Sequence, residues 1–377
     1  MLQHDQDPPN KVAFVTGASG FIGRFLLAEL LRQGYQVFAL LRQPKQQSAM
    51  LLAWLATQSI EMAADQVQWI QGDLSQPDVG ISLADWQRLA QVEVLFHSGA
   101  MFGWGLDVAM AKQVNVTGAL QLIAACQRHC ALQRVVWLSG YMLTMQTHLQ
   151  QAGINLAAPM QTDWRLLYQR LGPYEASKIE AHYQMQAFAQ AQGLAWTAIH
   201  PATVIGSSQT GEILPNQQFA LLLQQLCDQT LRAVPATPQH RLPLVCVDDL
   251  VRMTVAASRD ASTIGQCVLV ADPNTPNVAT VLQQAGQAIQ RAAPSRHVPL
   301  SVLRLILTWP WLANQLNLSA EMLHFFRTEA LETTQADQWR QTWQLPYPDQ
   351  AAAVAKTRAP APSLIPLALP AVTVPSF

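Results

Sequence analysis

Tyr174 and Lys178 stand four residues apart in the run Tyr-Glu-Ala-Ser-Lys. On a helix this spacing places both side chains on one face. A phenol with its ordinary pKa near ~10 is a weak acid–base group at neutral pH, and a neighbouring ammonium group is expected to lower that pKa. The pair could therefore transfer a proton, with Tyr174 as the acid and Lys178 as the group that tunes it.

A second pattern could bind a nucleotide. Gly17, Gly20 and Gly23 lie in the run Thr-Gly-Ala-Ser-Gly-Phe-Ile-Gly at 16–23, directly after the apolar residues 12–15. Gly17 would allow a tight turn, Gly20 would let the backbone approach phosphate, and Gly23 would let a helix pack closely on the strand. The N–H groups at the start of that helix would then face an anion. The turn is therefore predicted to hold the pyrophosphate of a dinucleotide, and Lys178 to hold its nicotinamide-ribose hydroxyls.

The end of the second predicted strand indicates which dinucleotide binds. An NAD site needs an acidic side chain there for the ribose 2′-hydroxyl. This strand ends in Ala-Leu-Leu-Arg at 39–42, with Lys45 beyond and no acid. The planar guanidinium of Arg42 suits a 2′-phosphate, and Arg24 on the first helix could assist. The sequence therefore predicts NADPH and favours it over NADH.

Alternating elements must position these groups. Six strands are predicted at 11–16, 35–41, 67–71, 92–97, 133–139 and 194–199. Helices are predicted at 21–33, 45–58, 83–90, 107–130 and 175–192. Such alternation with short loops is typical of a Rossmann-type α/β fold, a doubly wound parallel sheet with helices on both faces.

The chain divides into four predicted parts. Residues 1–10 form a flexible N-terminus, 11–206 the NAD(P)-binding domain, and 207–350 a smaller substrate-binding lobe, from which 243–258 could return to the sheet. Residues 351–377 are rich in Pro and Ala and are expected to form a flexible tail.

Composition excludes several partners. The 377 residues are 50% hydrophobic and 12% charged, with a net charge of −1 and no basic run, so a nucleic-acid partner is not expected. The longest apolar stretch, 298–312, contains Arg304 and Pro310, so no transmembrane span is expected. Five cysteines without metal-site spacing and the absence of a signal peptide indicate a reducing compartment, the cytoplasm, and no metal.

Taken together, these motifs resemble the extended short-chain dehydrogenase/reductase family. Besides the glycine turn and the Tyr-x-x-Ser-Lys run, the chain has Asp73-Leu74, His-Ser-Gly-Ala at 97–100, Asn115, and His-Pro-Ala-Thr-Val-Ile-Gly at 200–206. The resemblance covers about 11–345. It implies catalytic roles for Tyr174, Lys178 and Ser139. It also implies a cofactor site made of Gly17, Ser19, Gly20, Phe21, Ile22, Gly23, Arg42, Asp73, Leu74, Ser98, Gly99, Ala100, Tyr174, Lys178, Pro201, Thr203 and Val204.

A narrower likeness is carried by 72–86, 97–100 and 206–211. These stretches resemble thioester reductases and fatty acyl-CoA reductases of the male sterility type. The resemblance implies NADPH-dependent reduction of a carbonyl, as an acyl thioester or an aldehyde, with the apolar stretch 298–330 suited to an acyl chain. It also makes a homodimer through 107–130 and 175–192 possible.

Alternatives remain open. One is a sugar-nucleotide epimerase or dehydratase, whose diphosphate substrate could meet Arg232, Arg241 or Arg252. Others are a hydroxysteroid- or flavonoid-type reductase and a non-catalytic NADP-binding protein. The last is favoured by a departure from the family pattern: Gly140 stands where the family carries its catalytic hydroxyl. Ser139, one residue earlier, is the predicted replacement, and Thr144 is a more distant candidate.

Other polar residues receive structural interpretations. His182 stands where relatives often have Glu, and His200 where they usually have Arg. His97 is predicted to line the cofactor pocket. Asp248 and Asp249 begin a helix and are interpreted as N-cap carboxylates, with ordering of the lobe as the alternative. The remaining acids of interest, predicted to be solvated surface charges, are Asp163, Glu175 and Glu180.

Overall fold

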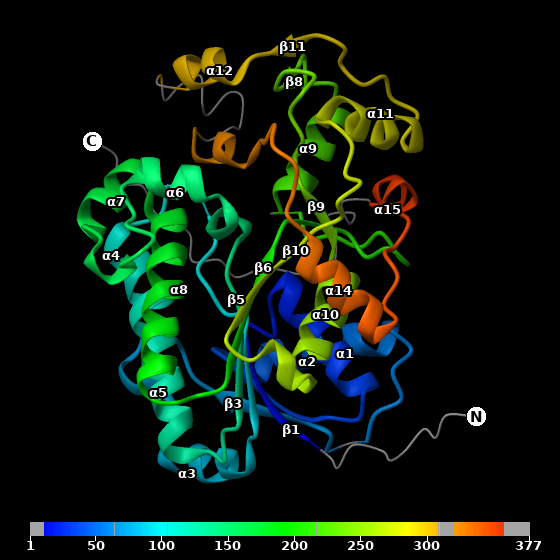
Figure 1. Cartoon of the computed structure of the whole chain (residues 1–377). Coiled ribbons are helices and arrows are strands. Elements are labelled where there is room, and N and C mark those ends of the chain that lie inside the picture. Colours follow the sequence, from blue (N-terminus) through cyan, green and yellow to red (C-terminus); the bar gives the residue numbers. More distant parts are fainter. Residues whose placement is uncertain are drawn as a thin grey trace, which may run out of the picture.

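A seven-stranded parallel sheet forms the centre of the protein (Figure 1). The computed structural model describes residues 11–63, 65–103, 105–215, 217–307, 309 and 320–357. The predicted N-terminal segment, 1–10, lies outside the described residues. Among the described helices, none is both long and apolar enough to cross a membrane.

The order of the strands in the sheet indicates where a ligand is expected to bind. In space they follow β10 (Gln266–Val270), β6 (Trp196–Pro201), β5 (Arg134–Leu138), β4 (Val94–His97), β1 (Val12–Thr16), β2 (Gln36–Leu41) and β3 (Val67–Gln71). The order reverses between β1 and β4, and ligands of doubly wound sheets bind beyond the carboxyl ends of the strands at such a reversal. The predicted Rossmann-type fold is confirmed.

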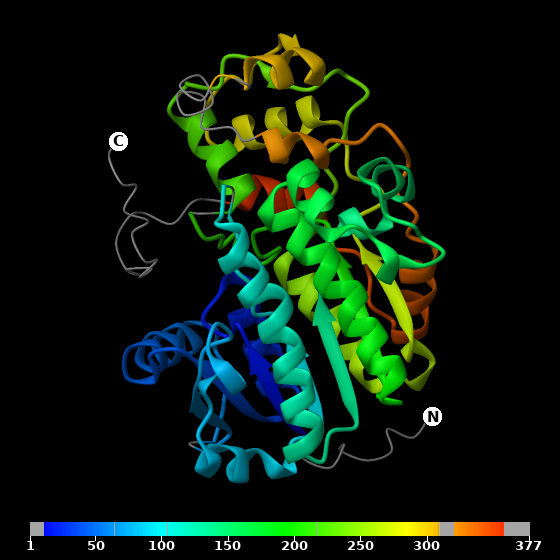
Figure 2. The same cartoon turned by 90° about the vertical axis from the view of Figure 1, so that its left-hand side faces the viewer.

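Helices cover both faces of the sheet (Figures 1 and 2). One face carries α1 (Phe21–Arg32), α2 (Pro44–Thr57) and α10 (Val247–Arg259). The other carries α3 (Leu83–Arg88), α5 (Ala119–His129) and α8 (Pro173–Ala191). Strand β1 shows why two cores form: Ala13 and Val15 enter one, while Val12 and Phe14 enter the other, as strand alternation requires.

The predicted helix at 107–130 is a continuous helical segment with an unusual centre. It runs from α4 (Val108–Lys112) through the π-helix η3 (Gln113–Gly118) into α5. Two helices that the sequence analysis did not predict, α6 (Gln146–Ala152) and α7 (Trp164–Leu171), fill the connection between β5 and α8. Shorter helical turns are η1 (Pro77–Gly80), η2 (Leu89–Gln91), η4 (Tyr141–Thr144), η5 (Pro159–Gln161) and η6 (Ala261–Thr263).

A smaller lobe lies beyond the carboxyl edge of the sheet, at the top of Figure 1. It contains α9 (Gln218–Cys227), β8 (Val234–Pro235), α11 (Val278–Ala288), β11 (His297–Val298), α12 (Leu300–Ile306), η7 (Ala320–Phe325) and α15 (Gln350–Lys356). Helix α15 packs on α11 and buries Ala353 and Val354. The expectation of a flexible tail from 351 is therefore wrong for 351–357, and residues 358–377 lie outside the described residues.

The predicted division at residue 206 needs a correction. Strand β9 (Leu244–Cys246) pairs with β7 (Thr203–Ile205) in a separate small sheet, so it does not return to the main one. What returns is α10, which packs beside α1, and then β10, which pairs with β6 as the seventh strand. Helix α14 (Thr334–Trp343) follows back along β10. The nucleotide-binding domain therefore includes α10, β10 and α14, which all lie within the predicted lobe range 207–350.

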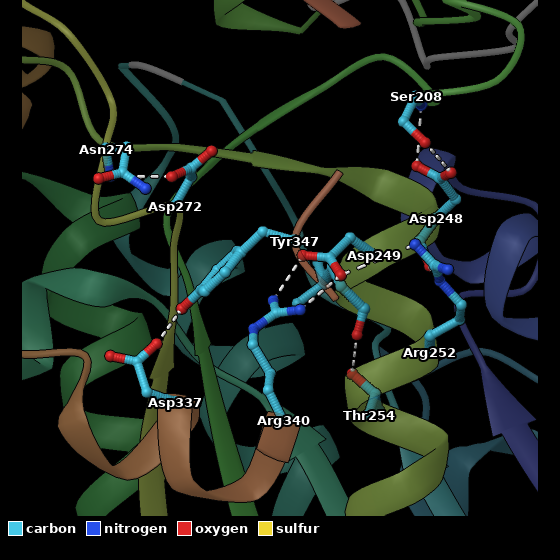
Figure 3. Close-up of polar contacts among 11 residues, drawn as sticks. Ser208, Asp248, Asp249, Arg252, Thr254, Asp272, Asn274, Asp337, Arg340 and Tyr347 are labelled. Atoms are coloured by element: carbon cyan, nitrogen blue, oxygen red, sulfur yellow. Dashed lines mark hydrogen bonds and ion pairs between the residues drawn. The ribbon is translucent and has the colours of Figure 1, made fainter. Parts of the chain in front are cut away.

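A buried ion pair fastens α14 to α10 (Figure 3). Arg340 donates from Nη1 to Asp249 Oδ1 at 2.9 Å and from Nη2 to Oδ2 at 2.6 Å, and both side chains are 4% exposed. The Arg340 guanidinium also lies 3.9 Å from the centre of the Tyr347 ring. Neighbouring Asp248 accepts hydrogen bonds from the N–H and hydroxyl of Ser208. The preferred interpretation as N-cap carboxylates is wrong: both aspartates order distant segments.

Asp249→Ala should destabilise the protein by about 3–5 kcal/mol, because it leaves the Arg340 charge buried and unpaired. Urea denaturation followed by circular dichroism measures the loss. Arg88→Ala, which removes an exposed ion pair with Asp85, is the control and should cost less than about 1 kcal/mol. The double variant Asp249→Leu/Arg340→Leu should lose less stability than Asp249→Ala alone, because it leaves no buried charge unpaired. An equal or larger loss of stability would show that the unpaired Arg340 charge is not the cause.

Candidate active site

The glycine turn connects β1 to α1 in the predicted way. Gly17 has a φ of +74°, and a Cβ on it would lie 2.7 Å from the Gly99 nitrogen. A Cβ on Gly23 would lie 1.9 Å from the Gly17 oxygen, so α1 can start this close to β1 only without a side chain there. A Cβ on Gly20 would lie 3.1 Å from the Gly17 oxygen. Gly20 and the preceding Ser19 are both exposed. The turn therefore presents bare backbone at a helix N-terminus, which fits a pyrophosphate.

The loop after β4 is tied to this turn. Ser98 Oγ donates to the Thr16 carbonyl at 2.7 Å, and the Gly99 N–H donates to Thr16 Oγ1 at 3.2 Å. His97 Nδ1 lies 2.8 Å from the same Thr16 hydroxyl. Burial, assisted by the charge of Lys178, lowers the pKa of His97 to about 3. His97 is therefore a neutral support beneath the turn, whereas its lining of the pocket stays a prediction.

The adenine side of the predicted site lies at the ends of β2 and β3. Arg42 is exposed directly after β2. Asp73 accepts from the Ser75 N–H and hydroxyl, both at 2.9 Å, which fixes the loop after β3. Arg24, in contrast, is buried and pairs with Glu212 at 3.2 Å while its guanidinium lies 5.2 Å from the Trp54 ring. The suggestion that Arg24 assists Arg42 is therefore not supported.

The remaining cofactor candidates occupy the same edge of the sheet. Phe21 and Ile22 open α1, and Ala100 follows the Ser98–Gly99 loop. Leu74 follows Asp73 and is buried. Pro201 ends β6, and Thr203 and Val204 lie in β7. Parallel strands bring these loops to one edge, although their contact with a cofactor stays a prediction.

Tyr174 and Lys178 lie in the first turns of α8, where Lys178 Nζ donates to the Leu138 carbonyl at the end of β5, at 2.8 Å. Burial lowers the pKa of Lys178 to about 8. The pKa of Tyr174 is raised, first by burial and then by the negative charge of Glu175. The expected lowering of this pKa by Lys178 is therefore not found. Tyr174 keeps its proton, which suits a proton donor.

The π-helix η3 supports the catalytic helix. Asn115 donates to Ser177 Oγ at 2.9 Å, and Ser177 donates to the Tyr174 carbonyl at 2.9 Å. Asn115 also exchanges hydrogen bonds with the backbone of Met101, at 2.7 and 3.1 Å. π-Helical turns often mark functional sites because they redirect a side chain. In the sequence Asn115 is recognisable only as part of the family pattern, and its role in holding the start of α8 follows from these contacts.

Ser139 and Gly140 occupy the end of β5. Ser139 Oγ lies 3.4 Å from His182 Nδ1, one helical turn beyond Lys178. At Gly140 a Cβ would lie 2.4 Å from Met142 Sδ, so a hydroxyl residue there would displace the methionine side chain. Thr144 is exposed, and its hydroxyl donates to the Tyr141 carbonyl. A catalytic role for Ser139 stays a prediction.

The two histidines that depart from the family pattern contact each other. The ring centres of His182 and His200 are 5.0 Å apart, and Cys267 Sγ lies 3.9 Å from His182 Nε2. Burial lowers the pKa of His182 to about 3 and holds the pKa of His200 well below its usual value, with the charge of Lys178 contributing to both shifts. Glu and Arg at these positions would be placed to pair with each other, whereas here two neutral imidazoles fill the space.

Two acids predicted to be solvated are buried. Glu180 is 1% exposed and pairs with Lys112 at 3.1 Å. Glu175 is fully buried and contacts His148 and His324. The prediction of a solvated surface charge is therefore wrong for both. Asp163 is exposed and caps α7 by accepting from the Leu166 N–H.

Comparison with known proteins decides the family. The family model described as male sterility protein, an NAD-binding model, matches residues 15–254. The chain belongs to this family. The resemblance to extended short-chain reductases is thus confirmed, as is the prediction of an NAD(P)-dependent enzyme of that type.

Similar proteins fit this assignment. A putative dihydroflavonol 4-reductase of Synechocystis is 27% identical over 79% of this chain and 77% of its own length. An aldehyde reductase of Aspergillus flavus is 26% identical over 69% of the chain, which spans only 26% of that protein.

Solved structures share the fold. The terminal R domain of the myxalamid PKS-NRPS pathway has a TM-score of 0.72 at 20% identity, covering 93% of this chain and 90% of that one. Gre2 of Candida albicans in complex with NADPH has a TM-score of 0.65 at 17% identity, covering 92% and 97%.

Stability should fall between pH 7 and pH 5, because His97 stays neutral in the folded protein but gains a proton near pH ~6.5 when unfolded. A histidine of this kind costs about 2 kcal/mol over that interval. Urea denaturation at both pH values measures the loss. His97→Asn keeps a polar atom for Thr16. Between pH 7 and pH 5 its free energy of unfolding should fall by about 2 kcal/mol less than that of the wild type. The same loss in both proteins would contradict the assignment.

Proposed function

We propose that the protein is an NADPH-dependent reductase of a carbonyl substrate. The observation that carries this proposal is the arrangement at the carboxyl edge of the sheet. There the bare glycine turn faces outward from β1, and Tyr174 and Lys178 lie on α8 against the end of β5. The first feature suits a dinucleotide, and the second supplies a proton donor beside it.

Bound NADPH would supply a hydride to the carbonyl carbon. Tyr174 would then donate its phenolic proton to the carbonyl oxygen, and its raised pKa keeps that proton in place until charge develops on the substrate. Lys178 would hold ribose hydroxyls, and the positive charge it carries when protonated would stabilise the tyrosinate left after proton transfer. Asn115 and Ser177 would fix the start of α8 through the Tyr174 carbonyl.

Arg42 supports NADPH as the cofactor. Its exposed guanidinium at the end of β2 can donate two parallel hydrogen bonds to a 2′-phosphate, and no carboxylate occupies the position that would accept from a 2′-hydroxyl. Gre2, which shares the fold, is described as a complex with NADPH.

An acyl thioester or an aldehyde is the proposed substrate. Two similar proteins carry the names terminal R domain of a PKS-NRPS pathway and aldehyde reductase. In this chain the apolar lobe at the carboxyl edge supplies buried Leu323, Phe325 and Phe326 near the catalytic helix. Ser139 remains the predicted polarising hydroxyl, and it would have to exchange its contact with His182 for one with the substrate oxygen.

A non-catalytic NADP-binding protein is the second candidate function, and Gly140 is the observation that favours it. The two proposals differ in turnover. Purified protein is mixed with NADPH and a panel of acyl-CoA thioesters, aldehydes and ketones. Oxidation of NADPH with any panel member excludes a non-catalytic protein. Binding of NADPH without turnover on the whole panel excludes the proposed reductase.

Tyr174→Phe should lower kcat on the best panel substrate by roughly 10²–10⁴-fold, because the proton donor is lost. Loss of NADPH absorbance measures the rate. Tyr183→Phe, on the same helix, is the control and should keep the wild-type rate. Unchanged turnover in Tyr174→Phe would show that another group donates the proton.

Arg42→Ala should raise the Kd for NADPH by roughly 10–100-fold, the cost of losing charged hydrogen bonds to phosphate, and leave the Kd for NADH unchanged. Titration of the cofactor's fluorescence measures both constants. Arg32→Ala, at the far end of α1, should change neither. Tighter binding of NADH than NADPH by the wild-type protein would contradict the role of Arg42.

A further inference from the structure

We propose that Glu175, His148 and His324 form a latch that holds η7 as one wall of the proposed substrate site, with Glu175 as a positioning residue. The inference rests on the proposed function, because it assigns a specificity role within that same site. It concerns a segment that is far from the catalytic residues in sequence.

The three latch residues come from three separate elements. Glu175 lies in the first turn of α8, next to Tyr174. Its Oε1 lies 2.6 Å from His148 Nε2 on α6, and its Oε2 lies 3.0 Å from His324 Nδ1 on η7. Each imidazole therefore engages a different carboxylate oxygen. One carboxylate joins the catalytic helix to the lobe and to the connection after β5.

A second contact at the same end of η7 ties it to the turn η4, which follows β5. Tyr141, the first residue of η4, donates its hydroxyl to the Phe325 carbonyl, and the two rings lie 5.4 Å apart. Two residues later, Arg327 exchanges backbone hydrogen bonds with Arg241, at 2.7 and 2.8 Å. The segment 324–327 is thus fixed against both η4, the turn after β5, and α8, the helix that carries Tyr174 and Lys178.

The geometry favours hydrogen bonds over a shared metal ion. A fully buried carboxylate must be compensated, either by N–H donors or by a cation. A metal would place both nitrogens and one oxygen about 2.0–2.2 Å from a single point, which separates the ligand atoms by more than 3 Å. The 2.6 Å contact is too short for that arrangement and matches a charge-assisted hydrogen bond.

A wall held in this way should act on substrate binding. Leu323 and Phe325 in η7 and Phe326 directly after it are buried, so the placement of these side chains depends on where the segment docks. Release of the latch would let this apolar surface shift while Tyr174, Lys178 and the glycine turn keep their own contacts. Loss of the latch should therefore raise KM for an apolar acyl substrate more than it lowers kcat.

Paired variants test the latch. His324→Asn keeps an N–H donor near the Nδ1 position, whereas His324→Leu removes it. His148→Gln keeps a donor near Nε2, whereas His148→Leu removes it. His297→Leu is the control, because His297 lies in the same lobe and its ring hydrogen-bonds the Ala236 carbonyl there. Hydrogen exchange of the backbone at 323–327 is measured in each 377-residue protein, with and without NADP⁺.

We expect the two leucine variants to speed exchange at 323–327 by about tenfold or more, the factor for one lost hydrogen bond to a charged group. The Asn and Gln variants should exchange more slowly than their leucine partners, and His297→Leu should match the wild type. KM on the active panel substrate should rise about tenfold in the leucine variants, with kcat within about twofold.

Two results would overturn the proposal. Exchange at 323–327 that is the same in the leucine variants as in His297→Leu would show that the latch does not hold η7. A metal site would be shown instead if exchange at 323–327 sped up equally in all four latch variants and if EDTA also sped up exchange in the wild type. Exchange needs no substrate, so these results stand even if the panel shows no turnover.

Discussion

Close contact between three backbones, those of β1, α1 and the loop after β4, is the constraint on which the site depends. Gly17 lies where they meet, and a side chain on it would collide with the Gly99 backbone; a side chain on Gly23 would collide with Gly17 itself. This contact fixes the start of α1 at the strand-order reversal. The same contact lets Thr16 receive hydrogen bonds from the β4 loop while supported by His97. Gly20, in the same turn, stays exposed and offers bare backbone that suits a phosphate.

Burial then determines the chemistry of the groups around this contact. Desolvation holds His97, His182 and His200 neutral and lowers the pKa of Lys178, while it raises the pKa of Tyr174. The result is a region in which the ammonium of Lys178 has no carboxylate close by on β5 or β6. It donates instead to the Leu138 carbonyl. The raised pKa of Tyr174 keeps its phenol protonated until an alkoxide forms on the substrate and accepts the proton.

Local patterns account for what the sequence could predict. The glycine spacing, the strand–helix alternation and the four-residue spacing of Tyr174 and Lys178 each concern neighbours along the chain, and the sheet and the helices follow from them. The errors concern partners that are distant in sequence. Nothing near Glu175 indicates His324, 149 residues away, and nothing near Asp249 indicates Arg340, 91 residues away. An acid in the first turn of a helix is ordinarily solvated and stabilised by the helix dipole, so the local sequence predicts a surface charge for Glu175 and an N-cap carboxylate for Asp249.

Those two errors share one physical cause. Glu175 and Asp249 are each the third residue of a helix that starts at or near the carboxyl edge of the sheet, α8 and α10. The N-terminus of a helix stabilises a carboxylate, so an acid can be kept there even when a second segment covers it. The chain from 320 to 357 uses both positions: His324 binds one carboxylate and Arg340 the other. The starts of α8 and α10 thus serve as anchoring points for this segment: the contact of His324 places η7 against the helix that carries Tyr174, and the contact of Arg340 holds α14 on α10.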